Sequence, residues 1–201
     1  RAELVAAGRY RLTRLLRGQG GSEDAGAAAA PAGSAFVLLD ARVVALPTAR
    51  DDVGRDVTLK VGPEPRGYDD AAYVTVTAAI GGRGLTPWSP CGLKATRSRA
   101  TGDVTLSWIR RSRLAGADAW TAADVALGEE TERYRLEILA GPVAVRTIEI
   151  ATPSFVWSAA AQIADVGATP VAVTLRVAQI GTALGPGIAR HATIPIEEGR
   201  P

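Results

Sequence analysis

Residues Gly102–Arg110, which read GDVTLSWIR, carry the clearest strand pattern of the chain. Its apolar side chains alternate with polar ones, so that Val104, Leu106 and Trp108 fall on one face. Because successive side chains of a β-strand point to opposite sides, this period of two residues predicts a strand with one buried face and one solvated face. We expect Trp108 to lie in the core that covers the buried face.

Further strands are predicted downstream and just upstream of this stretch. They are Gly92–Ala95, Tyr134–Ile138, Val145–Ile150, Phe155–Trp157, Val171–Val177 and Ile188–Ile196. Ser158–Asp165 suits one or two helical turns, with Ser158 as the N-cap and Gly167 as the stop. Short strands at this spacing favour a β-sandwich of the immunoglobulin or fibronectin type III class. We prefer the fibronectin type III-like form, because a single cysteine cannot form the inter-sheet disulfide of antibody domains.

The N-terminal half is also predicted to be rich in strands. They are expected at Arg9–Arg17, Phe36–Leu39, Val43–Leu46, Asp56–Val61 and Tyr73–Thr77. The runs Phe36–Leu39 and Val43–Leu46 suit two strands paired around a tight turn, and Ala25–Gly33 has the Ala/Gly/Pro composition of a surface loop. Glycines and prolines cluster over Gly81–Pro90, which indicates a domain boundary. We therefore expect an all-β chain, with a small β-rich domain at residues 1–85 and a fibronectin type III-like domain at residues 86–201.

Composition argues against several functional classes. The chain has 201 residues, of which 47% are hydrophobic, enough for a packed core. The net charge of +2 is too small for a dedicated nucleic-acid binder. Apolar runs are too short to span a bilayer, so no membrane insertion is expected. Because residue 1 is Arg and the chain contains no Met, we expect a piece of a longer polypeptide.

Catalytic and metal-binding patterns are not predicted. The chain contains one histidine, His191, in a strand-like stretch, and one cysteine, Cys91, which we interpret as a small buried core residue. A zinc site normally needs three or four such ligands. The pairs Asp51-Asp52 and Asp69-Asp70 lack the spaced acidic loop of a strong calcium site. We expect no catalytic residue, no metal and no cofactor.

The acidic cluster Glu129–Glu132 also offers no catalytic pattern. Catalytic carboxylate pairs need separated environments with different solvation, and these glutamates are adjacent or nearly so. We expect them to form a solvated turn.

The residues most suggestive of an interaction surface are arginines and tryptophans. The set is Arg97, Arg99, Arg110, Arg111 and Arg113, together with Trp88 and Trp120. In a sandwich the arginines would lie near the ends of the first two strands, where they could form one patch that binds an anionic polysaccharide or an acidic subunit. The alternative is that they are scattered and solvated. The two tryptophans are either exposed carbohydrate platforms or packing residues at the domain junction and the rim of the sandwich.

Several segments together resemble a known family. They are Tyr10–Glu23, Leu85–Pro90, Gly102–Arg113, Leu127–Glu130, Gln162–Gly167 and Arg176–Gln179. The first of them resembles the strand-and-turn signature of siphophage tail-tip proteins, and of the host-specificity or baseplate hub ("megatron") proteins of gene transfer agents in particular. Leu85–Pro90 resembles the lead into a fibronectin-like module in that family. The loops Ala25–Pro31 and Asp69–Ala72 depart from the pattern.

The resemblance implies a structural role in the tail of a virion or virion-like particle, which is assembled in the bacterial cytoplasm and released. It implies three copies around the tail axis, in contact with other tail and baseplate proteins. Members of the family also carry an upstream barrel similar to glycoside hydrolases, and because none of it lies in this sequence we expect a non-enzymatic assembly module. The alternative is a receptor- or glycan-binding module that contacts envelope polysaccharide of the recipient cell.

Overall fold

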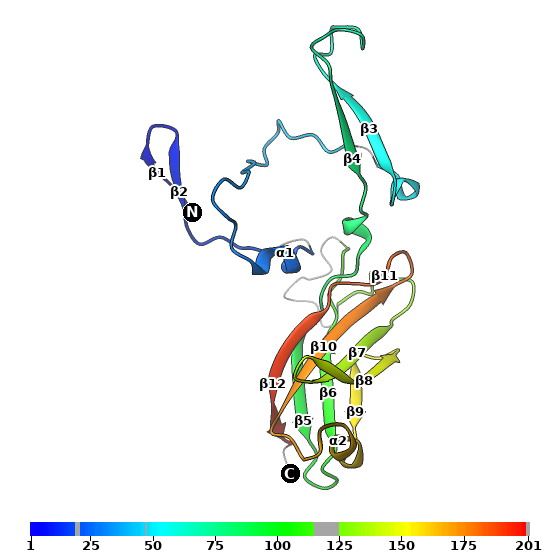
Figure 1. Cartoon of the computed structure of the whole chain (residues 1–201). Helices are drawn as coiled ribbons and strands as arrows, with labels where there is room; N and C mark the ends of the chain where they lie inside the picture. Colours follow the sequence, from blue (N-terminus) through cyan, green and yellow to red (C-terminus); the bar gives the residue numbers. More distant parts are fainter. Residues whose placement is uncertain (19–20, 47, 115–124, 200–201) are drawn as a thin grey trace. The chain divides into compact units, whose positions relative to one another are not determined.

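The structure is a computed structural model that describes residues 1–18, 21–46, 48–114 and 125–199 (Figure 1). It divides into two compact units, one made of Arg1–Ala29 and Gly84–Pro201 and the other of Ala30–Arg83. The second unit ends near the boundary expected between residues 85 and 86. The assignment of residues 1–85 and 86–201 to two domains stays a prediction.

The first unit contains a β-sandwich. One sheet consists of β5 (Cys91–Arg97), β6 (Val104–Ile109) and β9 (Ser154–Trp157). The other consists of β7 (Tyr134–Ala140), β8 (Val143–Ile150), β10 (Ala172–Gly181) and β12 (Arg190–Glu198). The short β11 (Gly185–Pro186) pairs with β10, and β12 also pairs in parallel with β5. The order β8-β7-β10-β12-β5-β6-β9 is that of a fibronectin type III sandwich, so the predicted fold class is confirmed.

The core lies where the alternation predicted it. Val104 and Leu106 on β6 are fully buried, and Trp108 is 4% exposed. From the facing sheet, Tyr134 packs its ring edge-on against Trp108, with ring centroids 5.3 Å apart. The inward faces of β7 and β10 add further buried aliphatic side chains. Burial of these faces is the main source of stability of the sandwich.

The predicted helix is confirmed as α2 (Ala159–Val166). The Ser158 hydroxyl accepts a hydrogen bond from the backbone N–H of Ala161 at 3.2 Å, which satisfies one of the free donors at the helix start. The helix ends at Gly167, whose φ of 76° lies in the left-handed region that glycine adopts without strain.

The described residues also form two hairpins and some short helical turns. The first unit also contains β1 (Ala2–Ala6), β2 (Arg9–Leu12) and α1 (Glu23–Ala27). The second unit contains β3 (Asp56–Val61) and β4 (Val74–Ala79), with the 3-10 turn Arg50–Asp52; the 3-10 turn Arg83–Leu85 follows at its end. No helix among the described residues is long and apolar enough to span a membrane.

The structure corrects three predictions about the strands and the core. The runs Phe36–Leu39 and Val43–Leu46 are not strands, because neither finds a partner to share hydrogen bonds, and their large side chains are exposed. The strand predicted at Arg9–Arg17 ends at Leu12, and Arg14 has a φ of 54°, which breaks an extended chain. Cys91 is exposed rather than buried.

Candidate interaction surface

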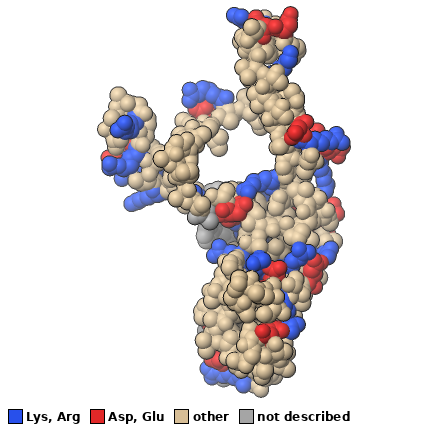
Figure 2. Space-filling view, in the orientation of Figure 1, with Lys and Arg blue, Asp and Glu red and all other residues tan. Residues whose placement is uncertain are grey.

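The arginines expected to form one patch lie at opposite ends of the sandwich. β5 and β6 are antiparallel, with Arg97 opposite Val104 and Cys91 opposite Ile109. Arg97 therefore lies at one end of this strand pair, while Arg110 to Arg113 follow β6 at the other. On the face drawn in Figure 2, blue and red side chains lie next to each other over the sandwich, which is the appearance of ion pairs rather than of a single basic patch.

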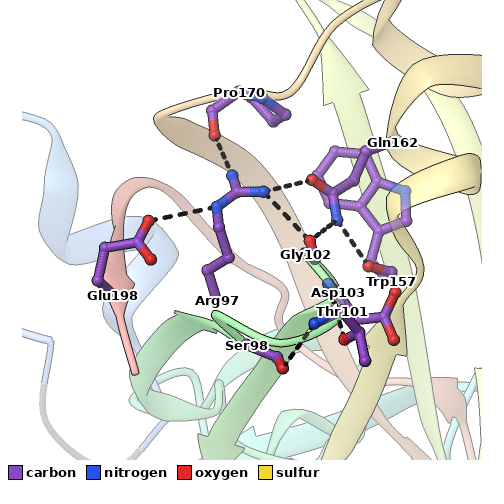
Figure 3. A network of polar contacts seen from close by, with 9 residues as sticks. All are labelled: Arg97, Ser98, Thr101, Gly102, Asp103, Trp157, Gln162, Pro170 and Glu198. Carbon is purple, nitrogen blue, oxygen red and sulfur yellow. Dashed lines mark hydrogen bonds and ion pairs between the residues drawn. The ribbon is translucent and has the colours of Figure 1, made fainter. Parts of the chain in front are cut away.

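Arg97 is used inside the sandwich (Figure 3). Its side chain is 12% exposed. Its guanidinium donates hydrogen bonds to the carbonyl of Gly102 at 3.2 Å, the Oε1 of Gln162 at 3.0 Å and the carbonyl of Pro170 at 2.6 Å. Its Nε lies 3.5 Å from Glu198. Arg97 thus connects the β5–β6 turn, helix α2 and β12, and it is not available to an outside partner.

The buried amide of Gln162 continues this network. Its Nε2 donates to the carbonyl of Gly102 at 3.0 Å and to the carbonyl of Trp157 at 2.9 Å. The carboxylate of Asp103 accepts a hydrogen bond from the backbone of Ala159 at 2.9 Å. Both polar atoms of the Gln162 side chain are therefore partnered although the residue is fully buried, which is the condition for a buried amide to stabilise a fold.

A second network closes the other side of α2. Asp165 accepts hydrogen bonds from Arg146 at 2.6 and 2.9 Å and from the indole of Trp157 at 2.8 Å. The hydrogen bond from Arg146 is the main cause that holds the pKa of Asp165 below its usual range, and the Trp157 indole acts in the same direction.

The opposite end of the sandwich holds Arg110. Its guanidinium donates to Glu132 at 2.9 Å and to the carbonyl of Val125 at 2.5 Å. Glu132 also accepts a hydrogen bond from the hydroxyl of Tyr134 at 2.7 Å. Burial, followed by the Glu132 carboxylate, raises the pKa of Tyr134, so that it stays protonated and a donor.

Arg113 forms an ion pair that overturns the expectation of a solvated acidic turn. Its Nε donates to Glu129 at 2.8 Å, and the Glu129 side chain is only 4% exposed. Glu129 is therefore buried by Arg113 and by nearby residues of the same chain. Close packing against Gly181, where an added Cβ would come within 2.8 Å of Glu129, contributes to this burial.

Arg111 and Trp88 hold the N-terminal segment. Arg111 forms an ion pair with Glu23 of α1, and its guanidinium lies 4.9 Å from the ring centroid of Trp88. Gly21 lies so close to the same ring that an added Cβ would come within 2.6 Å of it. Trp88 is half-buried in these contacts. The remaining residues of the predicted surface are Arg99, which is exposed, and Trp120, which lies outside the described residues.

Within the unit of residues 30–83, the β3–β4 hairpin exposes an apolar surface. The register pairs Val57 with Ala78, Leu59 with Val76 and Val61 with Val74. Because paired residues share a face, all six apolar side chains lie on one side of this two-stranded ribbon. Val61, Val74 and Val76 are 56%, 61% and 44% exposed. The other side carries a different set, namely Asp56, Thr58, Lys60, Thr75, Thr77 and Ala79.

Other segments also expose apolar side chains. In the same unit, Phe36 and Leu39 are 71% and 81% exposed. In the N-terminal hairpin, Leu4 lies opposite Tyr10 and both are 62% exposed. The sequence predicted the strands of both hairpins in part. It did not show that, among the described residues, each of these two sheets has only two strands and exposes apolar side chains.

One family model matches the N-terminal end of the chain. Residues 1–37 match the family model described as Rcc01698-like, C-terminal. The match includes the β1–β2 hairpin and α1, and it ends before the sandwich. No match is found among curated proteins.

Two solved structures are similar to the chain. Domains d3–d4 of the extracellular region of rat CD45 are 11% identical, over 97% of this chain and 93% of that chain, with a TM-score of 0.38. The FN5 domain of Drosophila Lar is 17% identical, over 56% of this chain and 99% of that chain, with a TM-score of 0.29.

Proposed function

We propose that this protein is a structural assembly module in the tail tip or baseplate of a phage-like particle of the gene transfer agent kind. It contacts neighbouring tail proteins and further copies of itself around the tail axis, and it carries no catalytic activity of its own. The resemblance carried by Tyr10–Glu23 supports this role, and that stretch lies within the residues that match the Rcc01698-like family model.

The observation that carries the proposal is the uncovered apolar face of the β3–β4 hairpin. An isolated two-stranded hairpin is only marginally stable in water, because it has no second layer to bury its apolar side chains. Burial of a valine or leucine side chain contributes about 1.5–3 kcal/mol, and this hairpin leaves several of them exposed. If a neighbouring protein covers this face, burial of these side chains stabilises the assembly.

The composition and charge of the unit suit such a contact. Besides the hairpin face, residues 30–83 expose further large apolar side chains, among them Phe36, Leu39 and Tyr68. Residues 30–83 contain six basic and seven acidic residues, so the net charge of the unit is close to zero. It therefore does not repel a neighbouring protein of either charge. Figure 2 shows the charged side chains of this hairpin mainly near its ends, with an uncharged stretch between them.

The alternative role in glycan binding finds less support at the residues that the sequence indicated for it. Arg110, Arg111 and Arg113 are engaged in internal ion pairs, and Trp88 is covered in part by Arg111 and Gly21. An outside ligand would have to compete with these contacts.

The test places two lysines on each face of β4 in turn. The double variant Val74→Lys/Val76→Lys puts charges on the apolar face, and Thr75→Lys/Thr77→Lys puts the same two charges on the polar face of the same strand. We expect the first variant to lose incorporation into particles by about 100-fold, since two valines contribute about 3 kcal/mol. The second variant should assemble normally. Equal incorporation of both variants would contradict the proposed function.

A further inference from the structure

A shallow recess lies on the outer face of the sheet β8-β7-β10-β12. It has a volume of about 210 Å³, and Arg135 and Glu137 of β7 and Arg176 of β10 line its sides. Ala178 faces Arg135 across the strand pair, and Arg176 faces Glu137. Because paired residues share a face, the two arginines and the glutamate converge on the same hollow.

Small residues form the rest of the recess. Ala178 lies between the long side chains, and Gly187 and Ala189 follow β11 along the neighbouring edge. The recess arises because these three residues have small side chains or none, while the residues around them have long ones. Its volume is below the roughly 300–1,000 Å³ of pockets for drug-sized ligands, so it suits a group of about one sugar ring.

The charge around the recess is positive on balance. Arg176 lies 3.0 Å from Glu137, while Arg135 and Arg133 share a single carboxylate, that of Glu149, at 2.9 and 2.6 Å. Two guanidinium groups and one carboxylate, those of Arg135, Arg176 and Glu137, line the recess itself, so its lining is positive on balance.

The two lining arginines are also accessible. The side chains of Arg135 and Arg176 are 42% and 44% exposed. A guanidinium has five N–H donors, so donors remain after one contact with a glutamate.

We propose that this recess binds a carboxylate-bearing sugar residue of an acidic polysaccharide. Arg135 and Arg176 donate hydrogen bonds to the sugar carboxylate, a geometry to which the planar guanidinium is well matched. Glu137 accepts hydrogen bonds from ring hydroxyls. The exposed ring of Pro186 contacts the apolar face of the sugar. The site is open to one side, so a polymer can continue past it. This inference does not depend on the assembly role.

The binding test uses the full chain labelled with ¹⁵N and three probes of similar length. Tetragalacturonate is the acidic sugar, maltotetraose its neutral counterpart, and tetraglutamate an acidic peptide. We expect tetragalacturonate alone to shift the amide signals of Ala178, Gly187 and Ala189, with a dissociation constant of about 1 mM. Absence of shifts with tetragalacturonate at low salt, or stronger binding of tetraglutamate, would overturn the proposal; the second result would indicate an acidic protein as the ligand.

Variants locate the site. Arg135→Gln and Arg176→Gln should each weaken binding by about tenfold, because each removes a charge-assisted hydrogen bond. The matched control is Arg133→Gln. Arg133 also pairs with Glu149, so the variant removes one positive charge from the same cluster, but Arg133 does not line the recess. Ala189→Leu should block binding by filling the hollow while both arginines stay in place. If Arg133→Gln weakens binding as much as Arg135→Gln does, general surface charge and not the recess explains the result.

Discussion

Replacement of Arg97 by methionine tests whether the network beside α2 stabilises the sandwich. Methionine keeps a long flexible side chain but cannot donate hydrogen bonds. The Oε1 of the fully buried Gln162 would lose its hydrogen-bond donor. The carbonyl of the half-buried Pro170 would lose the hydrogen bond that it accepts from Arg97. The carbonyl of Gly102 keeps its bond from Gln162. Glu198 is 53% exposed and returns to water at little cost.

The expected loss follows from these partners. A buried polar group left without a partner costs about 1–3 kcal/mol, so Arg97→Met should lower the free energy of unfolding by roughly 2–4 kcal/mol. Urea unfolding followed by tryptophan fluorescence measures it. The matched control is Arg99→Met, two residues further on and exposed, which should change stability by less than about 0.5 kcal/mol. A loss below about 0.5 kcal/mol for Arg97→Met would mean that the Arg97 network does not stabilise the sandwich.

Three further predictions concern local contacts. The lowered pKa of Asp165 means that its ionised form stabilises the fold above the unfolded pKa of about 3.9, and that this contribution is lost as the pH falls through the lower folded value. Acid unfolding of Asp165→Asn should lack this part of the pH dependence, which a urea series at pH 2–6 tests. Gly167→Ala should lower the free energy of unfolding by about 1 kcal/mol, because the φ of 76° at this position is unfavourable for alanine. Thermal unfolding measures this loss, and an unchanged melting temperature would contradict the prediction. Gly21→Ala should release the N-terminal segment from Trp88, seen as faster proteolysis before residue 29 with unchanged stability of the sandwich. Unchanged proteolysis would mean that the contact with Trp88 does not hold the segment.

The sandwich could be predicted from sequence because its signals are local. Alternation at Val104, Leu106 and Trp108 reports a buried face within one strand, and Ser158 and Gly167 report the two ends of a helix within ten residues. Each of these patterns is set by backbone geometry close to the residue concerned.

The fate of the arginines could not be predicted, because their partners are distant in sequence. Arg97 meets Gln162 65 residues away, and Arg111 meets Glu23 88 residues away. A basic residue that the fold pairs with a carboxylate is indistinguishable in sequence from a free one. The same limit applies to Phe36–Leu39, where β-branched and aromatic residues indicate strand propensity but do not show whether a neighbouring strand is available.

The most direct test of the assembly role measures whether the apolar face of the β3–β4 hairpin is covered in a particle. Cys91 is exposed, so it is first replaced by serine. Val76→Cys and Thr77→Cys then place single thiols on the two faces of β4, and maleimide labelling rates are compared in the free chain and in assembled particles. We expect Val76→Cys to be labelled at least tenfold more slowly in particles than in the free chain, and Thr77→Cys to be labelled at a similar rate in both. Equal labelling of Val76→Cys in the particle and in the free chain would contradict the assembly role.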